Sequence, residues 1–226
     1  PDRSFIERIY DPMKKYLGYF DRVRDREDCG LYDVVDQFET GQEYMSRYTV
    51  VDPMADRYGW INSIRLKGVD ATVYVYNLKK ALAWMAGLLG LKEERKLFEE
   101  SATKTKKAVL ELMWDDHEEI FSDVNPVDFK RTGVKAAVCF YPYMTDIVDE
   151  SHLPGLKKHL LNPDEFWTEY PVVSTSVDDR LFSQWAEWKG KRHNCPWNGR
   201  VWPMTNSHMV DVLGFCARRF DDRLLR

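Results

Sequence analysis

The strongest structural signal in this chain is one long helix that would be covered on most of its sides. Along residues 69–89, apolar side chains recur at steps of four, three and four, which is the spacing of one helix face, at Leu78, Leu82, Met85 and Leu89. A second apolar stripe runs through Ala81, Trp84 and Leu88. A helix that is apolar on two stripes cannot face water on either of them, so it must lie inside a larger helical assembly.

A second helical pattern follows directly. Gly90 is a natural helix end, and residues 92–114 again show apolar positions at helical spacing with a polar opposite face. Two long helices with a short joint predict an αα-hairpin. Further helices are predicted at 5–19, 153–161 and 203–220, the last beginning at Pro203. The strand signals are weak, and the best are at 48–51 and 134–140. The chain is therefore predicted to be mainly α.

Long irregular segments separate these helices, over residues 25–48, 115–143 and 162–202. Loops of this length usually carry function in a compact domain. Aromatic residues make up 14% of the chain, and many of them lie in these segments. Part of that content must be core, but it also suits a pocket that stacks on sugar-like ligands.

Charge and hydropathy exclude some classes of protein. Lys and Arg number 33 against 37 Asp and Glu, for a net charge of -4, which argues against a nucleic-acid footprint. The sequence lacks a run of 18 apolar residues, so it predicts no membrane span. The cysteines are widely spaced and are interpreted as free thiols. A cytoplasmic protein is therefore the default expectation, and a removed signal peptide leaves a secreted or periplasmic location open.

The most informative loop is residues 36–48. It combines carboxylates, amides, aromatics and Arg47 in thirteen residues, with Gly41 permitting a tight turn. Glycoside hydrolysis needs a carboxylic acid, aromatics that shape a pocket and polar groups that hold hydroxyls. The alternative is a solvated loop whose charges pair with one another, such as Glu43 with Arg47 at helical spacing.

Two other segments could contribute to the same pocket. In residues 195–206, Trp197 and Trp202 lie around a glycine and before a helix start, where the indoles could face a ligand or pack structurally. Asp70 stands at the start of the long helix. It could serve as a helix cap or bind a sugar hydroxyl.

Four motifs in a fixed order carry a family resemblance. The segment ETGQEYMSRY resembles the ESG-x-D-x-S-x-RW motif of trehalases, glucosidase family 63 and mannosylglycerate-hydrolase-like enzymes. The helix GVDATVYVYNLKKALAWMAGLLG looks like their VDLNAYL helix, with Thr72 where Asn is usual. FWTEYPVVSTSVDD is similar to their YGLPS-x-S stretch, and WNGRVWPMTN resembles WRGPVWPPxN. The resemblance runs from about Gly30 to Val212.

The resemblance implies an (α/α)6 toroid of the six-hairpin glycosidase class and inverting hydrolysis of an α-glucoside or α-mannoside. It places Glu43 at the position of the general-acid Asp, with one additional methylene, and in such a pocket Glu43 is expected to be protonated at working pH. Substrate contacts are then expected from Phe38, Glu39, Gln42, Arg47, Asp70, Trp197, Trp202 and Asn206. The implied partner is a carbohydrate, and no cofactor or metal is expected.

The chain departs from the family in its general base. After Asn206 it offers only Asp211, Asp221 and Asp222, none in a matching context. Further candidates for the general base are Asp36, Glu39, Asp70 and Asp178, although the sequence spacing singles out none of them. The helices are also fewer than six hairpins require. The expectation is a single domain over 1–226 that forms an incomplete portion of the toroid, truncated at one or both ends. Its uncovered helix faces would favour a homo-oligomer or a missing segment of the same enzyme.

Two other functions remain open. A sugar epimerase on the same toroid would use paired histidines, with His193 and His208 as the candidates. A non-catalytic glycan-binding or structural remnant of a glycosidase is the other. The acidic run at residues 115–119 is interpreted as a solvated turn, because its spacing does not match a calcium loop.

Overall fold

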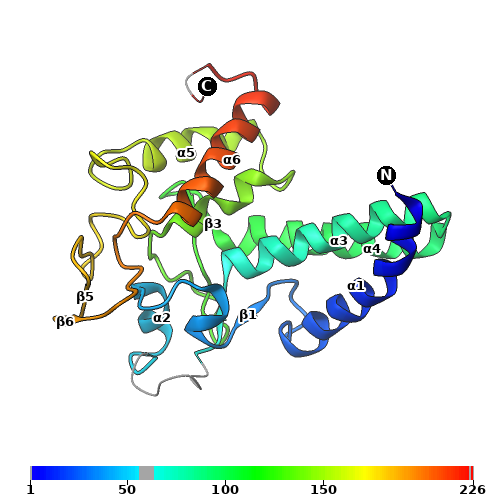
Figure 1. The fold of residues 1–226 in the computed structure, drawn as a ribbon, viewed down its shortest axis with the longest axis horizontal. Helices are drawn as coiled ribbons and strands as arrows, with labels where there is room; N and C mark the ends of the chain where they lie inside the picture. The colour runs from blue at the N-terminus through cyan, green and yellow to red at the C-terminus, as the bar shows by residue number, and fades with distance from the viewer. Residues whose placement is uncertain (1, 56–63, 224, 226) are drawn as a thin grey trace.

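Six α-helices, joined by short 3-10 turns and long loops, organise the described part of the chain. The computed structural model describes residues 2–55, 64–223 and 225. The α-helices are α1 (Arg3–Val23), α2 (Ser46–Val51), α3 (Val69–Leu89), α4 (Lys92–Ala108), α5 (Leu153–Leu160) and α6 (Pro203–Arg219) (Figure 1). Shorter helical turns are η1 (Gln37–Thr40), η3 (Ala137–Met144), η4 (Glu150–His152) and the π-helix η2 (Val109–Met113). The mainly α class is confirmed.

The strands form three small antiparallel pairs. These are β1 (Asp33–Val34) with β2 (Leu66–Lys67), β3 (Trp114–Asp115) with β4 (Ile120–Phe121), and β5 (Glu187–Trp188) with β6 (Lys191–Arg192). Each strand is two residues long, so the pairs fasten loops rather than build a sheet.

The predicted helical hairpin is confirmed. Helix α3 has the predicted bounds and ends at Gly90, which adopts φ 78°, a left-handed conformation that glycine adopts without strain. Helix α4 packs along it and widens into the π-helix instead of continuing as one α-helix to residue 114. Val109 and Met113 remain fully buried, so the predicted apolar face is kept through the wider turn.

Two strand predictions are wrong. Residues 48–51 belong to α2, and most of 134–140 lies in the 3-10 helix η3. A short apolar run signals burial without specifying the backbone. In α2 the decisive contacts are those of Arg47, and η3 is buried over Ala137–Tyr143, so tertiary contacts on several sides override the local preference.

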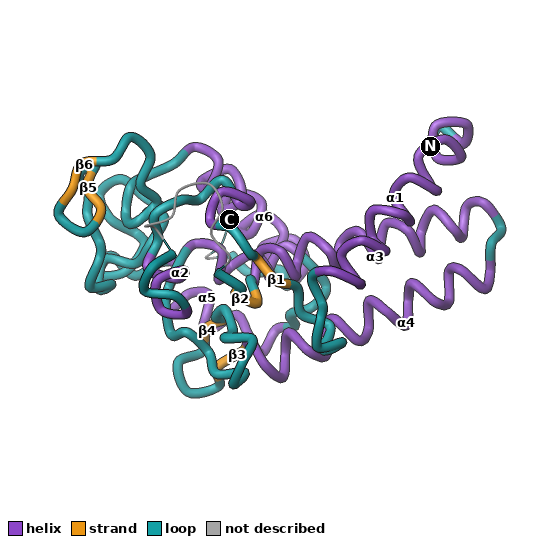
Figure 2. The backbone as a smooth tube through the Cα atoms, turned by 90° about the horizontal axis from the view of Figure 1, so that it is seen from below, coloured by secondary structure: helices purple, strands orange, loops and turns teal. Residues whose placement is uncertain are grey.

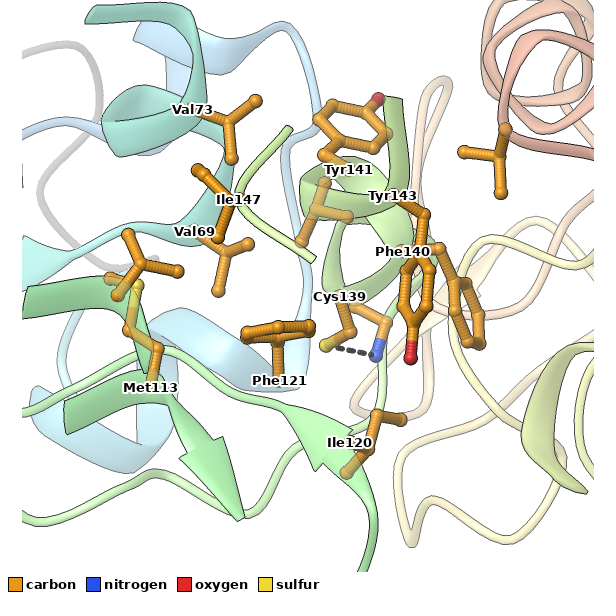
Figure 3. Close-up of a cluster of buried hydrophobic side chains, with 14 of the residues drawn as sticks. Val69, Val73, Met113, Ile120, Phe121, Cys139, Phe140, Tyr141, Tyr143 and Ile147 are labelled. Atoms are coloured by element: carbon orange, nitrogen blue, oxygen red, sulfur yellow. Dashed lines mark hydrogen bonds between the residues drawn. The ribbon is translucent and has the colours of Figure 1, made fainter. Parts of the chain in front are cut away.

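The main core lies where α3, β4 and η3 meet. Val69 and Val73 of α3 lie in one buried cluster with Phe121 of β4 and Tyr143 of η3 (Figure 3). A second cluster joins α1 to α3, through Ile6, Tyr10 and Leu17 on one side and Val75, Leu82 and Met85 on the other. Helix α3 therefore contributes to both cores. The predicted burial of its second stripe is wrong, since Trp84 and Leu88 of that stripe are exposed.

The helices and the loops occupy different ends of the molecule. Helices α1, α3 and α4 extend together to one side, while β5, β6 and the loops around them lie at the other (Figures 1 and 2). The short helix α2 and the start of α3 lie between these ends. The motif-bearing loops are therefore held at the amino end of α3. Within the described ranges, no helix is long and apolar enough to cross a membrane.

Lys79 is a charged residue inside the α3–α4 interface. It is 2% exposed, donates to Thr105 Oγ1 at 2.8 Å, and lies 5.1 Å from the ring centre of Tyr32. Burial, opposed by the charges of Asp21 and Asp25, lowers the pKa of Lys79 to about 8.

This burial predicts a pH-dependent stability. The unfolded chain holds the Lys79 proton up to a pH of about 10.4, whereas the folded chain releases it near 8. The fold therefore binds this proton less tightly, and its stability should rise with pH between these values. Urea unfolding of the wild type and Lys79→Met across pH 7–10.5 should show this rise only in the wild type. Parallel curves would contradict the assignment.

Candidate functional site

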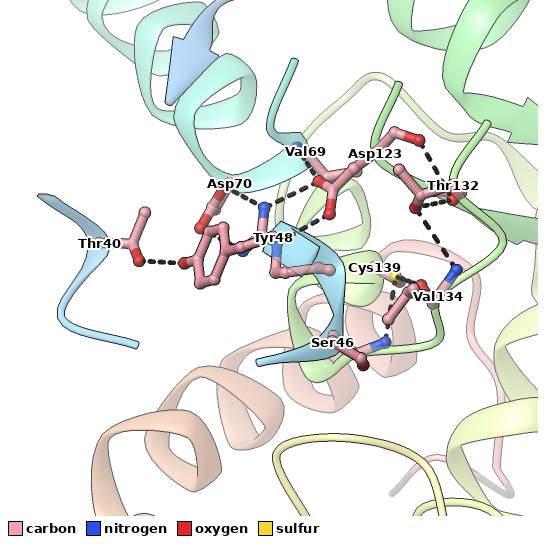
Figure 4. Close-up of polar contacts among 12 residues, drawn as sticks. Thr40, Ser46, Tyr48, Val69, Asp70, Asp123, Thr132, Val134 and Cys139 are labelled. Carbon is pink, nitrogen blue, oxygen red and sulfur yellow. Dashed lines mark hydrogen bonds and ion pairs between the residues drawn. The ribbon is translucent and has the colours of Figure 1, made fainter. Parts of the chain in front are cut away.

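A fully buried arginine joins three separate segments of the chain. The Arg47 guanidinium donates to Asp70 Oδ1 and Oδ2, both at 2.9 Å, and to Asp123 Oδ1 and Oδ2 at 2.8 and 2.7 Å. All three side chains are at most 1% exposed. Figure 4 shows Asp70 and Asp123 with the contacts that converge between them. Each carboxylate also accepts a backbone N–H, from Ala71 and Val69 respectively.

The two carboxylates of this triad differ electrostatically. Burial opposes ionisation of Asp70, but the Arg47 charge and its hydrogen bonds outweigh burial and hold the pKa of Asp70 below its usual value. At Asp123, burial prevails over the attraction of Arg47 and is reinforced by the Asp70 charge, so its pKa is raised. Despite burial, the two carboxylates raise the pKa of Arg47 well above its ordinary value. Asp123 is therefore the member that takes up a proton first as the pH falls.

The triad fixes the loop that precedes α2. Arg47 belongs to α2, and its neighbours add further anchors: Ser46 Oγ donates to Asp179 Oδ2 at 2.7 Å, and the Tyr48 and Thr40 hydroxyls lie 2.7 Å apart. Gly68 permits the close approach, because a Cβ there would lie 2.7 Å from Asp70 Oδ1. The sequence-based pairing of Glu43 with Arg47 is wrong, since Arg47 binds Asp70 and Asp123 instead.

Within that loop, two turns present Glu43. Asp36 caps η1 by accepting from Phe38 N at 2.8 Å, and Gly41 ends η1 with φ 64°. Tyr44 also has a positive φ of 58°, and its N–H donates to Gln37 Oε1 at 2.9 Å. This hydrogen bond supports the strained Tyr44 backbone directly after Glu43.

Glu43 contacts the second motif, although the two are about 150 residues apart in sequence. The backbone N–H of Trp197 donates to the Glu43 backbone oxygen at 2.9 Å, and the Cys195 thiol donates to Glu43 Oε2 at 3.7 Å. Glu43 is half-buried. The structure thus brings the loop of the expected acid and the Trp-Pro motif together at this carboxylate.

The two tryptophans stack on each other. Their ring centres are 4.4 Å apart with an interplanar angle of 11°, and Trp197 is 4% exposed. One face of each indole is therefore occupied by its neighbour. Asn206 accepts from Val172 N at 2.7 Å and donates to Val172 O at 3.1 Å, which ties the start of α6 to the preceding loop.

The remaining predicted contact residues lie around the same loop. Glu39 binds Arg24 and accepts from Val35 N at 3.0 Å. Gln42 is buried, and Phe38 makes an edge-to-face contact with Tyr44, with ring centres 6.2 Å apart. Their roles toward a substrate remain predictions.

A cavity of about 680 Å³ opens beside this loop, between α1, η1 and the start of α3. Its lining includes Glu39, Thr40, Asp70 and Tyr74, and aromatic side chains of α1 complete one wall. Glu43 lies outside this lining. Another cavity of about 730 Å³, between α3 and α4, is lined by none of the predicted site residues, so we take the first cavity as the candidate sugar pocket.

The carboxylates considered as general bases are each engaged. Asp36 caps a helical turn, Glu39 binds Arg24, Asp70 binds Arg47, and Asp178 binds Lys135. In the described part of the structure, no group of three His, Cys, Asp or Glu side chains is arranged to hold a metal ion. The acidic run at 115–119 forms the predicted turn, between β3 and β4.

Sequence reasoning misses several residues of this region. Asp123 lies outside the four motifs, and its only signal is its position two residues after the buried β4. Tyr141 of η3 is also missed; its hydroxyl lies 2.7 Å from His208 Nδ1. His193 lies elsewhere, against the Tyr44 ring at 4.4 Å, so the two epimerase candidates have different partners.

Comparison with solved structures shows the fold. Over its whole length, the chain superposes on the GH63 mannosylglycerate hydrolase from Thermus thermophilus, with a TM-score of 0.75, 17% identity and 59% of that chain covered. A sialidase matches with a TM-score of 0.78 and 17% identity, over 95% of this chain and 18% of its own. Neutral trehalase from Saccharomyces cerevisiae matches 66% of this chain at a TM-score of 0.53 and 14% identity, with 28% of that chain covered.

These matches confirm the (α/α)6 toroid fold. The chain spans less than two thirds of the length of each of these structures. The family model of the mannosylglycerate hydrolase MGH1-like glycoside hydrolase domain matches residues 1–215. That match covers nearly all of the chain and agrees with the four motifs. The chain therefore belongs to the MGH1-like glycoside hydrolase family.

Proposed function

We propose that this chain is the acid-bearing part of a glycosidase that cleaves an α-glucoside or α-mannoside with inversion. Glu43 is the general acid, and the water-activating base lies outside the residues of this chain. The Thermus thermophilus relative was solved with glucose and, separately, with Tris and D-glycerate. Glucose bound to that relative supports a hexoside as the substrate class.

One observation carries the proposal: Glu43 is held at both its backbone and its carboxylate by the Trp-Pro motif. A general acid must keep a fixed position relative to the glycosidic oxygen, and a site is precise only where surrounding contacts lock its residues. Behind Glu43, the buried triad of Arg47, Asp70 and Asp123 fixes the following helix. The motif that holds Glu43 thus contacts the α3 motif through Arg47 and the Trp-Pro motif through the Glu43 backbone.

The chemical step follows from this placement. Protonated Glu43 gives its proton to the glycosidic oxygen as the bond from that oxygen to C1 breaks, so the aglycone leaves as a neutral alcohol. Water attacks C1 from the opposite face and loses its proton to the base. An α-linked substrate then yields the β-anomer first. Asp70 and Glu39, which line the neighbouring cavity, are proposed to receive sugar hydroxyls.

A second candidate function is glycan binding without hydrolysis. It is favoured by the engagement of Asp36, Glu39, Asp70 and Asp178 with other groups, because a paired or capping carboxylate is a poor base.

Product stereochemistry tests the proposed function. Proton NMR of a reaction with α-linked disaccharides and aryl α-glucosides or α-mannosides should show the β-anomer before mutarotation. Calorimetry with the same sugars runs beside it. Early appearance of the α-anomer would contradict inversion. Saturable binding with no turnover, even when added azide replaces the base-activated water, would identify the glycan-binding alternative.

A further inference from the structure

The thiol of Cys195 has no assigned role, yet it contacts the proposed acid. Its Sγ lies 3.7 Å from Glu43 Oε2, within reach of a weak thiol donor. Two residues later, the backbone N–H of Trp197 donates to the Glu43 backbone oxygen at 2.9 Å. Residues 195 and 197 therefore hold Glu43 at its side chain and its backbone at once.

The environment of Cys195 keeps it a donor. Burial raises the pKa of the Cys195 thiol, and the Glu43 carboxylate raises it further, while Trp197 and the Arg200 charge act in the opposite direction. A thiol with a raised pKa remains protonated at neutral pH, so its hydrogen is available to the carboxylate.

Trp197 supplies an independent observation on the same point. Trp197 is 4% exposed, and its indole Nε1 is buried and makes no hydrogen bond within the described residues. A buried donor of this kind is costly unless it serves a purpose. The indole belongs to the residue two positions after Cys195, in the segment that contacts Glu43.

We propose that Cys195 is a positioning residue for Glu43: its thiol donates to the carboxylate and holds the acid arm in one orientation. The inference rests on the proposed function, because Glu43 matters to catalysis only as the acid. The physical reason is the length of the side chain. Glu has one more rotatable bond than the Asp of the family motif, and each additional rotamer lowers the fraction of the acid that points at the substrate.

The first test needs no hydrolysis. Iodoacetamide labelling, resolved by mass spectrometry, measures each thiol separately, and half-buried Cys29 is the matched internal control. Glu43→Ala removes the acceptor of the thiol hydrogen, so Cys195 should label about 5-fold faster at pH 7.5 while Cys29 is unchanged. An unchanged Cys195 rate would overturn the proposed contact.

The second test measures turnover. Cys195→Ala should lower kcat/KM on unactivated α-glycosides about 10-fold and spare dinitrophenyl glycosides, which need no proton. Cys195→Ser keeps a donor and should recover most of the rate. Full activity of Cys195→Ala on unactivated glycosides, or an equal loss on both classes of substrate, would overturn the positioning role.

Failure of the proposed function and failure of the positioning role of Cys195 give different results. If Glu43→Gln retains full activity on unactivated substrates, the proposed function is wrong, whatever Cys195 does. If the wild-type chain hydrolyses none of the glycosides, the labelling ratio alone decides whether the thiol senses the Glu43 carboxylate.

Discussion

Replacing Arg47 with Met is expected to lower the free energy of unfolding by about 3–5 kcal/mol. The change leaves Asp70 and Asp123 at most 1% exposed and without their cation. Two uncompensated carboxylates in one buried site must either take up protons or open the fold to water. Urea or thermal unfolding at pH 7 measures the loss, which is large against the roughly 5–15 kcal/mol that stabilises a typical domain.

An exposed arginine provides the matched control. Arg95 binds Glu99 at 2.7 Å, but the two side chains are 57% and 51% exposed, so Arg95→Met should cost less than about 1 kcal/mol. Combining Arg47→Met with Asp70→Asn and Asp123→Asn should recover part of the lost stability, because the buried charges are then gone. Equal effects of the two arginine substitutions would show that the triad is not the anchor described here.

Replacing Glu43 with Gln is expected to lower kcat on unactivated α-glycosides by about 10²–10⁴-fold. The amide keeps the size and the contact with Cys195 but cannot give up a proton to the leaving oxygen. Activity on dinitrophenyl glycosides should fall far less, because that leaving group departs without protonation. The alkaline limb of the pH–rate profile should also disappear, since the acid that produces it is absent.

A remote carboxylate controls for the loss of charge. Glu100 on α4 is 62% exposed and pairs loosely with Lys96, so Glu100→Gln should leave both rates unchanged. Glu43→Gln should unfold at nearly the same temperature as the wild type, because Glu43 is no part of the buried triad. Retained turnover on unactivated substrates, with the alkaline limb still present, would assign the acid to another residue.

Helix prediction succeeds where one pattern runs long enough. Helix α3 has the bounds that its apolar stripes and Gly90 predict, because over 21 residues the helical period is unambiguous. The short apolar runs at 48–51 and 134–140 predict strands, but the first is helical and the second is helical from Ala137 onward. At that length burial is visible in the sequence but the backbone conformation is not, since side-chain contacts from other segments decide it.

The residues of the candidate site also divide into those that the sequence identifies and those that only the fold reveals. Glu43, Arg47 and Asp70 can be singled out because they lie in motifs whose residue types suit one chemistry. Asp123 and Cys195 cannot, because each is a single residue whose role depends on what the fold places beside it. Sequence spacing also suggests the wrong partner for Arg47, since a local ion pair and a buried triad use the same residue types.

By itself, the amino-acid sequence determined that the chain is mainly α, that a helical hairpin forms its centre, and that four ordered motifs point to a glycosidase toroid. Periodicity and local motif chemistry act over neighbouring residues, so they can be read along the chain. Only the tertiary structure decided that Arg47 is buried between Asp70 and Asp123, and that Cys195 and Trp197 meet Glu43. The side-chain contacts among them join residues 23 to 152 positions apart, and such pairings are set by the packing of the whole core.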